Sequence, residues 1–247
     1  MPLDPEHWLK PAPAELGQGV TAFMTTFGPN FGRKAGDPEL AKANRAELAG
    51  LLDARPVFLD QVHGAGVARL QPGWHDDNAP QADAAVSTDP ELAVAILVAD
   101  CLPVLFAAPG GVAGAHAGWR GLAAGVLENT VAKLCAAAGC KPGDVKAWLG
   151  ACIGPEAFEV GPEVVAVFGR EPLPRDQPGF LYRPNPEPRW RADLALLARE
   201  RLAAAGVTQV SGGSWCTLTE ASRFFSFRGE ALGRARGRMA ACIALGR

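Results

Sequence analysis

Three residues with metal-binding side chains lie in otherwise apolar or turn-forming stretches. His63 stands in a Gln-Val-His-Gly segment, Cys101 closely follows an apolar run that begins at Leu92, and His116 lies beyond a second apolar run. Two imidazoles and one thiol are the ligand set of an open zinc site, which keeps a fourth position for water or substrate. A buried imidazole also needs a partner for each ring nitrogen. The residue types alone leave two interpretations open: a metal site, or a core in which Cys101 only fills space.

Three other polar residues stand where the pattern predicts buried or turning backbone. Arg120 follows His116 closely and precedes a predicted helix over 122–138, an arrangement that can hold a phosphate or carboxylate at the helix N-terminus. Asn44 falls within the apolar stripe of a predicted helix over 37–52, where it either hydrogen-bonds a neighbouring backbone segment or reaches solvent. Asp83 interrupts a short predicted strand and is interpreted as either a site residue or a turn anchor.

The elements that must position these residues alternate between strands and helices. Asp37 before Pro38 predicts a helix start, and Gly139 predicts the end of the helix over 122–138. A turn at 109–111 joins two apolar segments, which predicts adjacent buried strands. No repeat or linker is evident, so residues 1–247 are expected to form a single domain. Strands are predicted at 19–26, 56–61, from 67, 82–87, 92–98, 145–149, 207–210, 223–228 and 239–245, helices at 37–52, 122–138, 162–168 and 190–205, and an irregular excursion at 171–188.

Composition excludes several classes of protein. The chain has 247 residues, is 48% hydrophobic and carries 24 basic against 26 acidic residues, which offers no electrostatic footprint for nucleic acid. Its longest apolar run is far too short to span a membrane, and its N-terminus lacks the features of a signal peptide. We expect a cytoplasmic protein whose six scattered cysteines are reduced thiols, and no nucleic-acid or membrane partner.

Six ordered motifs give the chain a resemblance that covers Val20 to Leu245. They resemble the multicopper polyphenol oxidase (laccase-domain) family, which is also described as zinc-dependent purine nucleoside phosphorylases and named peptidoglycan editing factor. The resemblance implies an α+β fold, an α/β sandwich with mixed β-sheets flanked by helices. The motifs are Gln61-Val62-His63-Gly64, Ala99-Asp100-Cys101-Leu102-Pro103, His116-Ala117-Gly118-Trp119-Arg120-Gly121, Gly150-Ala151-Cys152-Ile153-Gly154-Pro155, Cys216-Thr217 and Phe225-Ser226-Phe227-Arg228.

The same resemblance implies a function and roles for individual residues. His63, Cys101 and His116 resemble the family's metal ligands, and Arg120 and Asn44 are the candidates for binding substrate or phosphate. The implied cofactor is zinc, with copper as the alternative metal. The implied reactions are phosphorolysis of inosine, adenosine or methylthioadenosine, and deamination of adenosine by a water that zinc activates. The expected partners are therefore a nucleoside and phosphate, while the oligomeric state stays open.

One departure from the family lies in the first loop. The family usually has an arginine after the strand's threonine, followed by a glycine pair and a serine, whereas here Thr26 is followed by Phe-Gly-Pro-Asn-Phe-Gly and then Arg33. Either the substrate arginine is missing or Arg33 replaces it from a remodelled loop. Gly229 also follows Arg228 where a second arginine is common. These changes bear on substrate preference rather than on the metal ligands.

Three other functions fit parts of the pattern. A multicopper oxidase needs more imidazoles than four histidines provide, but a single-copper, laccase-like centre needs only two histidines, Cys101 and an axial methionine from Met24 or Met239. A metal-free hydrolase would use Cys101 as nucleophile and His116 or His63 as base. A role as peptidoglycan editing factor rests on the family name alone. Zinc is favoured because three protein ligands and an open position suit it.

Overall fold

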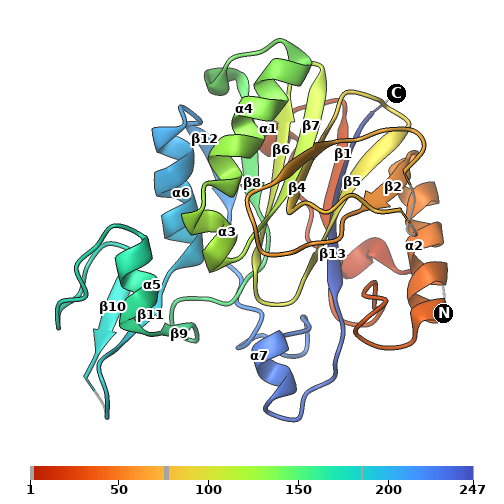
Figure 1. Ribbon diagram of the computed structural model, residues 1–247. Helices are drawn as coiled ribbons and strands as arrows, with labels where there is room; N and C mark the ends of the chain where they lie inside the picture. Colours follow the sequence, from red (N-terminus) through yellow and green to blue (C-terminus); the bar gives the residue numbers. More distant parts are fainter. Residues whose placement is uncertain (1–2, 75–77, 185, 247) are drawn as a thin grey trace.

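Two mixed β-sheets pack face to face and carry helices on their outer faces (Figure 1). The computed structural model describes residues 3–74, 78–184 and 186–246. One sheet has four strands and the other has six, and each combines parallel with antiparallel pairs. This architecture confirms the α+β sandwich with mixed sheets.

The four-stranded sheet consists of β1 (Val20–Met24), β13 (Met239–Leu245), β5 (Leu92–Val98) and β2 (Arg55–Phe58), in this order across the sheet. Only β5 and β2 pair in parallel. The strand β5 is apolar throughout, and its two faces are covered by the second sheet and by a helix, so all its side chains except the half-buried Leu97 are buried. The predicted strands at 19–26, 92–98 and 239–245 are confirmed.

The six-stranded sheet contains the strand that ends beside His116. Its strands β6 (Leu102–Ala108) and β7 (Gly111–Ala117) form an antiparallel hairpin through the predicted turn, where Gly110 adopts φ +78°. The strand β5 directly precedes β6 in the chain, but the two strands belong to different sheets. In order across the sheet the strands are β12 (Gln209–Gly212), β8 (Lys146–Leu149), β6 (Leu102–Ala108), β7 (Gly111–Ala117), β4 (Ala84–Ser87) and β3 (Val67–Arg69).

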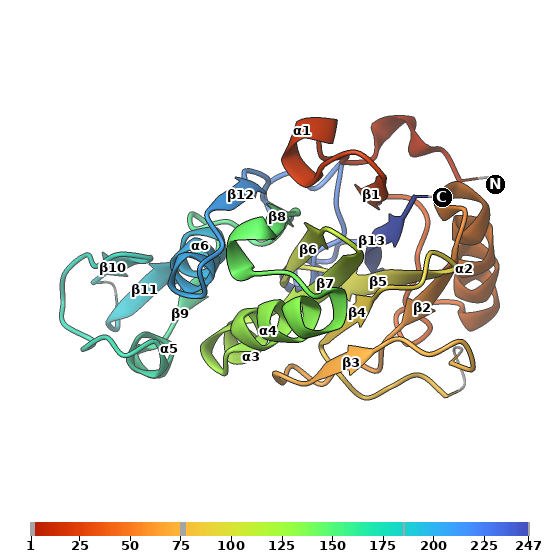
Figure 2. The ribbon, with the colours of Figure 1, turned by 90° about the horizontal axis from the view of Figure 1, so that it is seen from above.

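Apolar layers hold the sheets and helices together. Val94, Ile96, Leu105 and Ile243 are fully buried between the two sheets. The helix α2 (Pro38–Leu52) covers the outer face of the four-stranded sheet, and its N-terminus is capped by the Asp37 carboxylate as predicted. The helices α4 (Val126–Ala138) and α6 (Leu194–Ala204) lie on the side of the six-stranded sheet (Figures 1 and 2). Burial of both faces of each sheet is the main source of stability.

A small third sheet projects from the edge of the molecule near α6 (Figure 2). It is antiparallel and packs Phe180 and Trp190 into the core that also contains α6. None of the helices in the described chain has the length and apolar character that a membrane span requires. The remaining elements are β9 (Glu159–Val160), β10 (Phe180–Arg183), β11 (Arg189–Ala192), α1 (Pro13–Leu16), α3 (Trp119–Ala123), α5 (Pro162–Val167), α7 (Phe227–Glu230) and 3₁₀ turns at Pro5–His7 and Pro142–Asp144.

The predicted helix over 122–138 is wrong at its start. Two helices occupy this region, α3 and α4, and Gly125 with φ +90° separates them, because this backbone conformation ends the first helix. The predicted C-terminal glycine is confirmed, since Gly139 caps α4 with φ +68°. Arg120 therefore lies in the five-residue helix α3, and the longer helix does not begin beside His116.

Three predictions in the C-terminal half also differ from the structure. The excursion at 171–188 contains the strand β10, and the predicted helix over 190–205 begins with the strand β11, in which Trp190 and Ala192 alternate with half-buried arginines. The helix α6 starts only after Asp193, whose side chain caps it. The predicted strand over 223–228 is wrong, because Ser226 caps α7 instead.

Candidate metal centre

The three predicted ligands come from three loops or strand ends. His63 lies between β2 and β3 with φ +61°, and His116 lies near the end of β7. Cys101 lies where the chain leaves β5 in one sheet and enters β6 in the other. The site therefore forms at the edge where the chain crosses from one sheet to the other.

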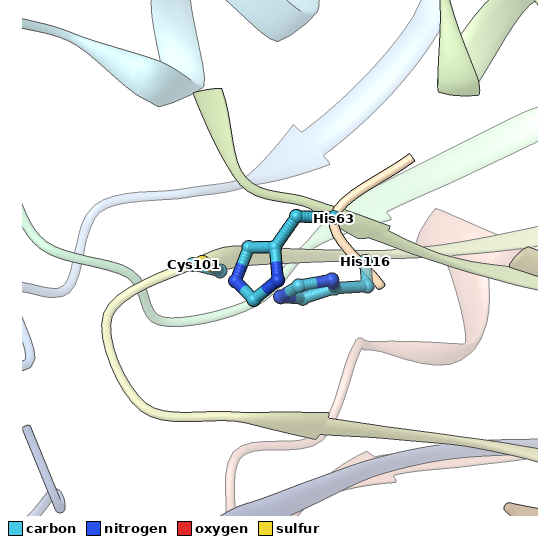
Figure 3. Close-up of side chains that lie close together, drawn as sticks. All are labelled: His63, Cys101 and His116. Carbon is cyan, nitrogen blue, oxygen red and sulfur yellow. The ribbon is translucent and has the colours of Figure 1, made fainter. Parts of the chain in front are cut away.

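The structure brings these three side chains together (Figure 3). One ligand atom from each lies within 4.8 Å of the others. The rings of His63 and His116 meet edge to face, with 4.8 Å between their centroids. His63 is exposed, Cys101 is half-buried and His116 is buried, so the cluster opens to solvent on the side of His63. Two imidazoles and a thiol in reach of one point fit a zinc ion with an open position.

Asp83 organises the cluster from behind. Its fully buried carboxylate contacts His116 Nδ1 at 2.8 Å and accepts hydrogen bonds from the backbone N–H groups of His63 at 2.8 Å, Gly64 at 2.7 Å and Val62 at 3.2 Å. The bond to Nδ1 fixes the ring so that Nε2 faces the cluster, as outer-shell carboxylates do for metal-binding histidines. Asp83 is thus both a turn anchor and a residue of the site, and the sequence had left these interpretations open.

Electrostatics in the cluster favour the metal-binding form of the thiol. Burial by itself raises the pKa of Cys101, but hydrogen bonds and charges from His116 and His63 outweigh it and lower the pKa to about 6. Burial lowers the pKa of His116, yet hydrogen bonds to Asp83 and Cys101 raise it to about 9. Burial raises the pKa of Asp83, and the contacts with His116 and the backbone N–H groups bring it below its usual value. A thiolate is therefore present at neutral pH, as metal binding requires.

Two glycines allow the backbone to approach the cluster closely. A Cβ atom on Gly118 would lie 2.9 Å from Cys101 Sγ and 3.4 Å from His63 Cδ2. A Cβ atom on Gly121 would lie only 2.6 Å from the carbonyl oxygen of Gly64. The start of α3 thus packs directly on the loop that carries His63, and any side chain at these positions would displace it.

The cluster lines a cavity of about 1010 Å³, large enough for a small organic ligand. Arg120 lines the same cavity, and its guanidinium lies 4.2 Å from the centre of the Trp119 ring. Asn44 is buried, and it is not among the residues of the described chain that line the cavity. Its side chain donates a hydrogen bond of 2.9 Å to the carbonyl oxygen of Asn30. This bond is the backbone contact considered for Asn44, while a direct contact with substrate stays a prediction.

The altered first loop reaches the cavity as well. Asn30 holds it in place by accepting hydrogen bonds from the N–H groups of Gly32 at 2.9 Å and Arg238 at 2.8 Å. Arg33 and Lys34 then lie among the cavity-lining residues. The loop therefore still brings cations to the cavity, which is compatible with Arg33 taking over the family's arginine.

Asp100 is a site residue that the sequence analysis did not single out. It adopts φ +87°, and its carboxylate accepts hydrogen bonds of 2.6 Å from both Thr217 Oγ1 and the N–H group of Arg228. Its carbonyl oxygen accepts a bond of 2.8 Å from the N–H group of Ile153. Four of the six sequence motifs thus meet next to Cys101. The spacing of residues in the sequence could not reveal these contacts of Asp100, because its partners lie far away along the chain.

The two methionines considered as axial copper ligands lie elsewhere, and the two remaining histidines are not part of the described cluster. Met24 and Met239 are fully buried in the core, and neither belongs to the cavity lining within the described ranges. Met24 Sδ instead accepts a hydrogen bond of 3.2 Å from the N–H group of Ala151. His7 is exposed near the N-terminus, and His75 lies outside the described residues.

The fold and the cluster together define a known class of protein. Residues 19–246 match the family model described as multi-copper polyphenol oxidoreductase laccase. The chain belongs to this family, which confirms the resemblance drawn from the six motifs.

Individual relatives extend the comparison. The chain is 46% identical over 78% of its length to the purine nucleoside phosphorylase PA4543 of Pseudomonas aeruginosa, and 76% of that protein is covered. It is 44% identical to the purine nucleoside phosphorylase YfiH of Escherichia coli, over 87% of this chain and 85% of the relative.

Solved structures agree with the architecture. The crystal structure of Neisseria meningitidis protein NMB0706 matches with a TM-score of 0.83 at 35% identity, covering 98% of this chain and 100% of that one. The structure of YlmD from Geobacillus stearothermophilus matches with a TM-score of 0.84 at 30% identity, covering 99% and 98%. These two solved structures therefore share the overall fold of this chain.

Proposed function

We propose that this chain is a zinc-dependent purine nucleoside phosphorylase that also deaminates adenosine. The observation that carries the proposal is the convergence of His63, Cys101 and His116 in a cavity that Arg120 also lines. The names of the relatives from Pseudomonas aeruginosa and Escherichia coli support the substrate class. Residues 1–247 as one catalytic domain, a cytoplasmic location and a role in peptidoglycan editing stay predictions.

The donor set fits zinc better than an electron-transfer copper. His63, Cys101 and His116 would hold the ion and leave one position open. A copper site of that kind adds a weak axial ligand, and both methionines considered for this role lie in the core. When bound, zinc would act as a Lewis acid and allow a water molecule to react at neutral pH.

The chain's own residues supply binding and orientation. In phosphorolysis a phosphate oxygen bonds to the anomeric carbon of the ribose, the bond from that carbon to the base breaks, and the base leaves with a proton. Arg120, whose guanidinium has no carboxylate partner within the described part of the chain, is placed to bind the phosphate. We propose that Asn44 acts through the loop that contains Asn30.

The decisive test is product analysis. Protein loaded with zinc is incubated with phosphate and inosine, adenosine or methylthioadenosine, and the products are separated by chromatography. We expect phosphate-dependent release of free base and sugar phosphate, and inosine from adenosine by deamination. Cys101→Ala should abolish both, because it removes a metal ligand, and Cys242→Ala in the core serves as the matched control. Full activity in a metal-free Cys101→Ala protein would contradict the proposal.

A cysteine hydrolase is the second candidate, supported by one observation. Cys101 with a pKa of about 6 beside His116 with a pKa of about 9 is also the state of a nucleophilic thiolate–imidazolium pair. The second imidazole, His63, favours the metal, because such a pair uses only one base. Metal analysis of protein purified without chelator distinguishes the two, since a bound ion occupies the thiolate and blocks its alkylation.

A further inference from the structure

Among the cations that line the cavity, Arg228 has a backbone that is tied to the metal cluster. Arg228 lines the cavity together with Cys101, His116 and Arg120. Within the described ranges its guanidinium has no carboxylate partner, and its recorded side-chain contact is with the Phe158 ring, whose centre lies 5.9 Å away. An arginine beside a polar cavity without a carboxylate partner is a binding group for an anion.

The two acidic residues that line the described cavity do not form an ion pair with the guanidinium of Arg228. Asp100 uses both oxygens in hydrogen bonds of 2.6 Å, to Thr217 Oγ1 and to the backbone N–H group of Arg228. Asp60, the other acidic lining residue, pairs with Lys34 at 3.4 Å. The side chain of Arg228 therefore keeps its capacity to bind an anion that enters the cavity.

The position of Arg228 is fixed by its main chain rather than by its side chain. The N–H group of Arg228 donates to Asp100, which directly precedes the ligand Cys101. Ser226 Oγ accepts a hydrogen bond of 2.9 Å from the N–H group of Gly229 and holds the other side of the turn. Asp100 itself is held by Thr217, which is fully buried. The anchor is thus a rigid connection between the metal ligand and the arginine.

We propose that Arg228 is a second phosphate-binding residue that acts with Arg120, and that Asp100 is the positioning residue that holds it. This inference rests on the proposed function for the choice of phosphate as the anion. Two guanidinium groups offer more fork-shaped donors than one, which suits an anion with several equivalent oxygens. Asp100 connects the metal cluster with the arginine. It directly precedes Cys101, and it accepts hydrogen bonds from the backbone N–H groups of Ile153 and Arg228.

Calorimetric titration with inorganic phosphate tests the binding role directly. We expect Arg228→Gln in the zinc-loaded protein to weaken phosphate binding about 10- to 100-fold, the loss expected for charge-assisted hydrogen bonds. Arg228→Lys keeps the charge without the fork and should fall between Arg228→Gln and the wild type. Arg223→Gln is the matched control, because that arginine pairs with Glu220 and lies outside the cavity lining. Wild-type affinity in Arg228→Gln, or no phosphate binding by the wild-type protein, would overturn the inference.

The positioning role has its own readout. Asp100→Asn removes the charge and leaves one acceptor oxygen, and Thr217 Oγ1 must then accept from the amide if the N–H group of Arg228 keeps its bond, so we expect weaker phosphate binding while zinc content stays stoichiometric. Thr217→Val removes only the hydroxyl bond with little change of shape and should weaken phosphate binding less, in the same direction. In both variants the KM for phosphate should rise and the KM for nucleoside should not. Unchanged phosphate affinity in both variants refutes the positioning role.

These measurements also separate two kinds of failure. If the wild-type protein releases no base from nucleosides, the proposed function fails, but phosphate titration still tests Arg228. If base is released and Arg228→Gln has a normal KM for phosphate, the function stands and this inference is wrong.

Discussion

Replacing Asp83 by asparagine changes one oxygen of a buried carboxylate into an amide nitrogen and keeps the side chain almost the same size. Oδ1 contacts His63 N–H and His116 Nδ1, and Oδ2 accepts from Val62 and Gly64 N–H. With its NH₂ group in place of Oδ2 the asparagine faces two backbone donors, whereas in place of Oδ1 it faces one, the N–H group of His63, because His116 Nδ1 can accept from the amide in its other tautomer. The less costly orientation leaves one part-buried donor unsatisfied, so we expect metal-free Asp83→Asn to lose about 1–3 kcal/mol of unfolding free energy.

The same substitution should weaken zinc binding separately. The amide no longer fixes the ring of His116 or raises its basicity, and loss of such an outer-shell partner lowers metal affinity about 10- to 100-fold. Urea unfolding in chelator gives the free energy of unfolding, and competition with a chromophoric chelator gives the zinc affinity. Both losses are expected in one variant because one carboxylate serves both tasks.

Asp89→Asn is the matched control. Asp89 Oδ1 accepts one hydrogen bond, from the N–H group of Glu91 in a surface turn, and an asparagine can still accept it. Its unfolding free energy should change by less than about 0.5 kcal/mol. An Asp83→Asn protein whose stability and zinc affinity both match this control would refute the account of Asp83.

Three further substitutions or modifications test other contacts. Gly118→Ala should lower zinc affinity about tenfold or more, measured by chelator competition, because its Cβ would lie 2.9 Å from Cys101 Sγ; an unchanged affinity contradicts this. In metal-free protein, iodoacetamide should alkylate Cys101 with a half-maximal rate near pH 6, since its lowered pKa keeps the thiolate present above that pH. Buried Cys242, whose pKa is raised, should stay unmodified at pH 7 in native protein, and equal labelling by mass spectrometry argues against the difference. Asn44→Ala should cost about 1–3 kcal/mol in urea unfolding because it strands a loop carbonyl, whereas exposed Asn129→Ala should cost less, and equal losses would exclude a special role for Asn44.

The pattern of apolar residues correctly predicted the elements whose burial is regular from one end to the other. The strand β5 is apolar on both faces, and α2 begins after the capping residue Asp37, with Pro38 in its first turn. The same reasoning failed where one residue overrides the pattern. Gly125 ends α3 within an otherwise continuous apolar stripe, and Trp190 pairs in a strand although its neighbours also fit a helix. These outcomes depend on tertiary contacts and backbone conformation, which a local pattern does not contain.

The three side chains of the candidate metal centre could be singled out from the sequence, but the way they are held could not. Two imidazoles and a thiol identify a donor set from sequence alone, and the family motifs then select it over an inert core. The support comes from Asp83 and Asp100, whose partners are largely backbone N–H groups 19 to 128 residues away. Every residue except proline has such a group, so no residue type marks the partner. Asp83 was therefore ambiguous in the sequence.

The crossing between the two sheets explains why these supports are acidic. The chain leaves one sheet at Val98 and enters the other at Leu102, so the residues between them cannot use the hydrogen bonds of either sheet. Backbone N–H groups from neighbouring turns also end at this edge without strand partners, and a carboxylate can accept several of them at once. Asp100 does this for the turn at Arg228, as Asp83 does for the turn at His63. Each carboxylate thereby holds a turn at the cavity, one carrying the candidate ligand His63 and the other carrying Arg228.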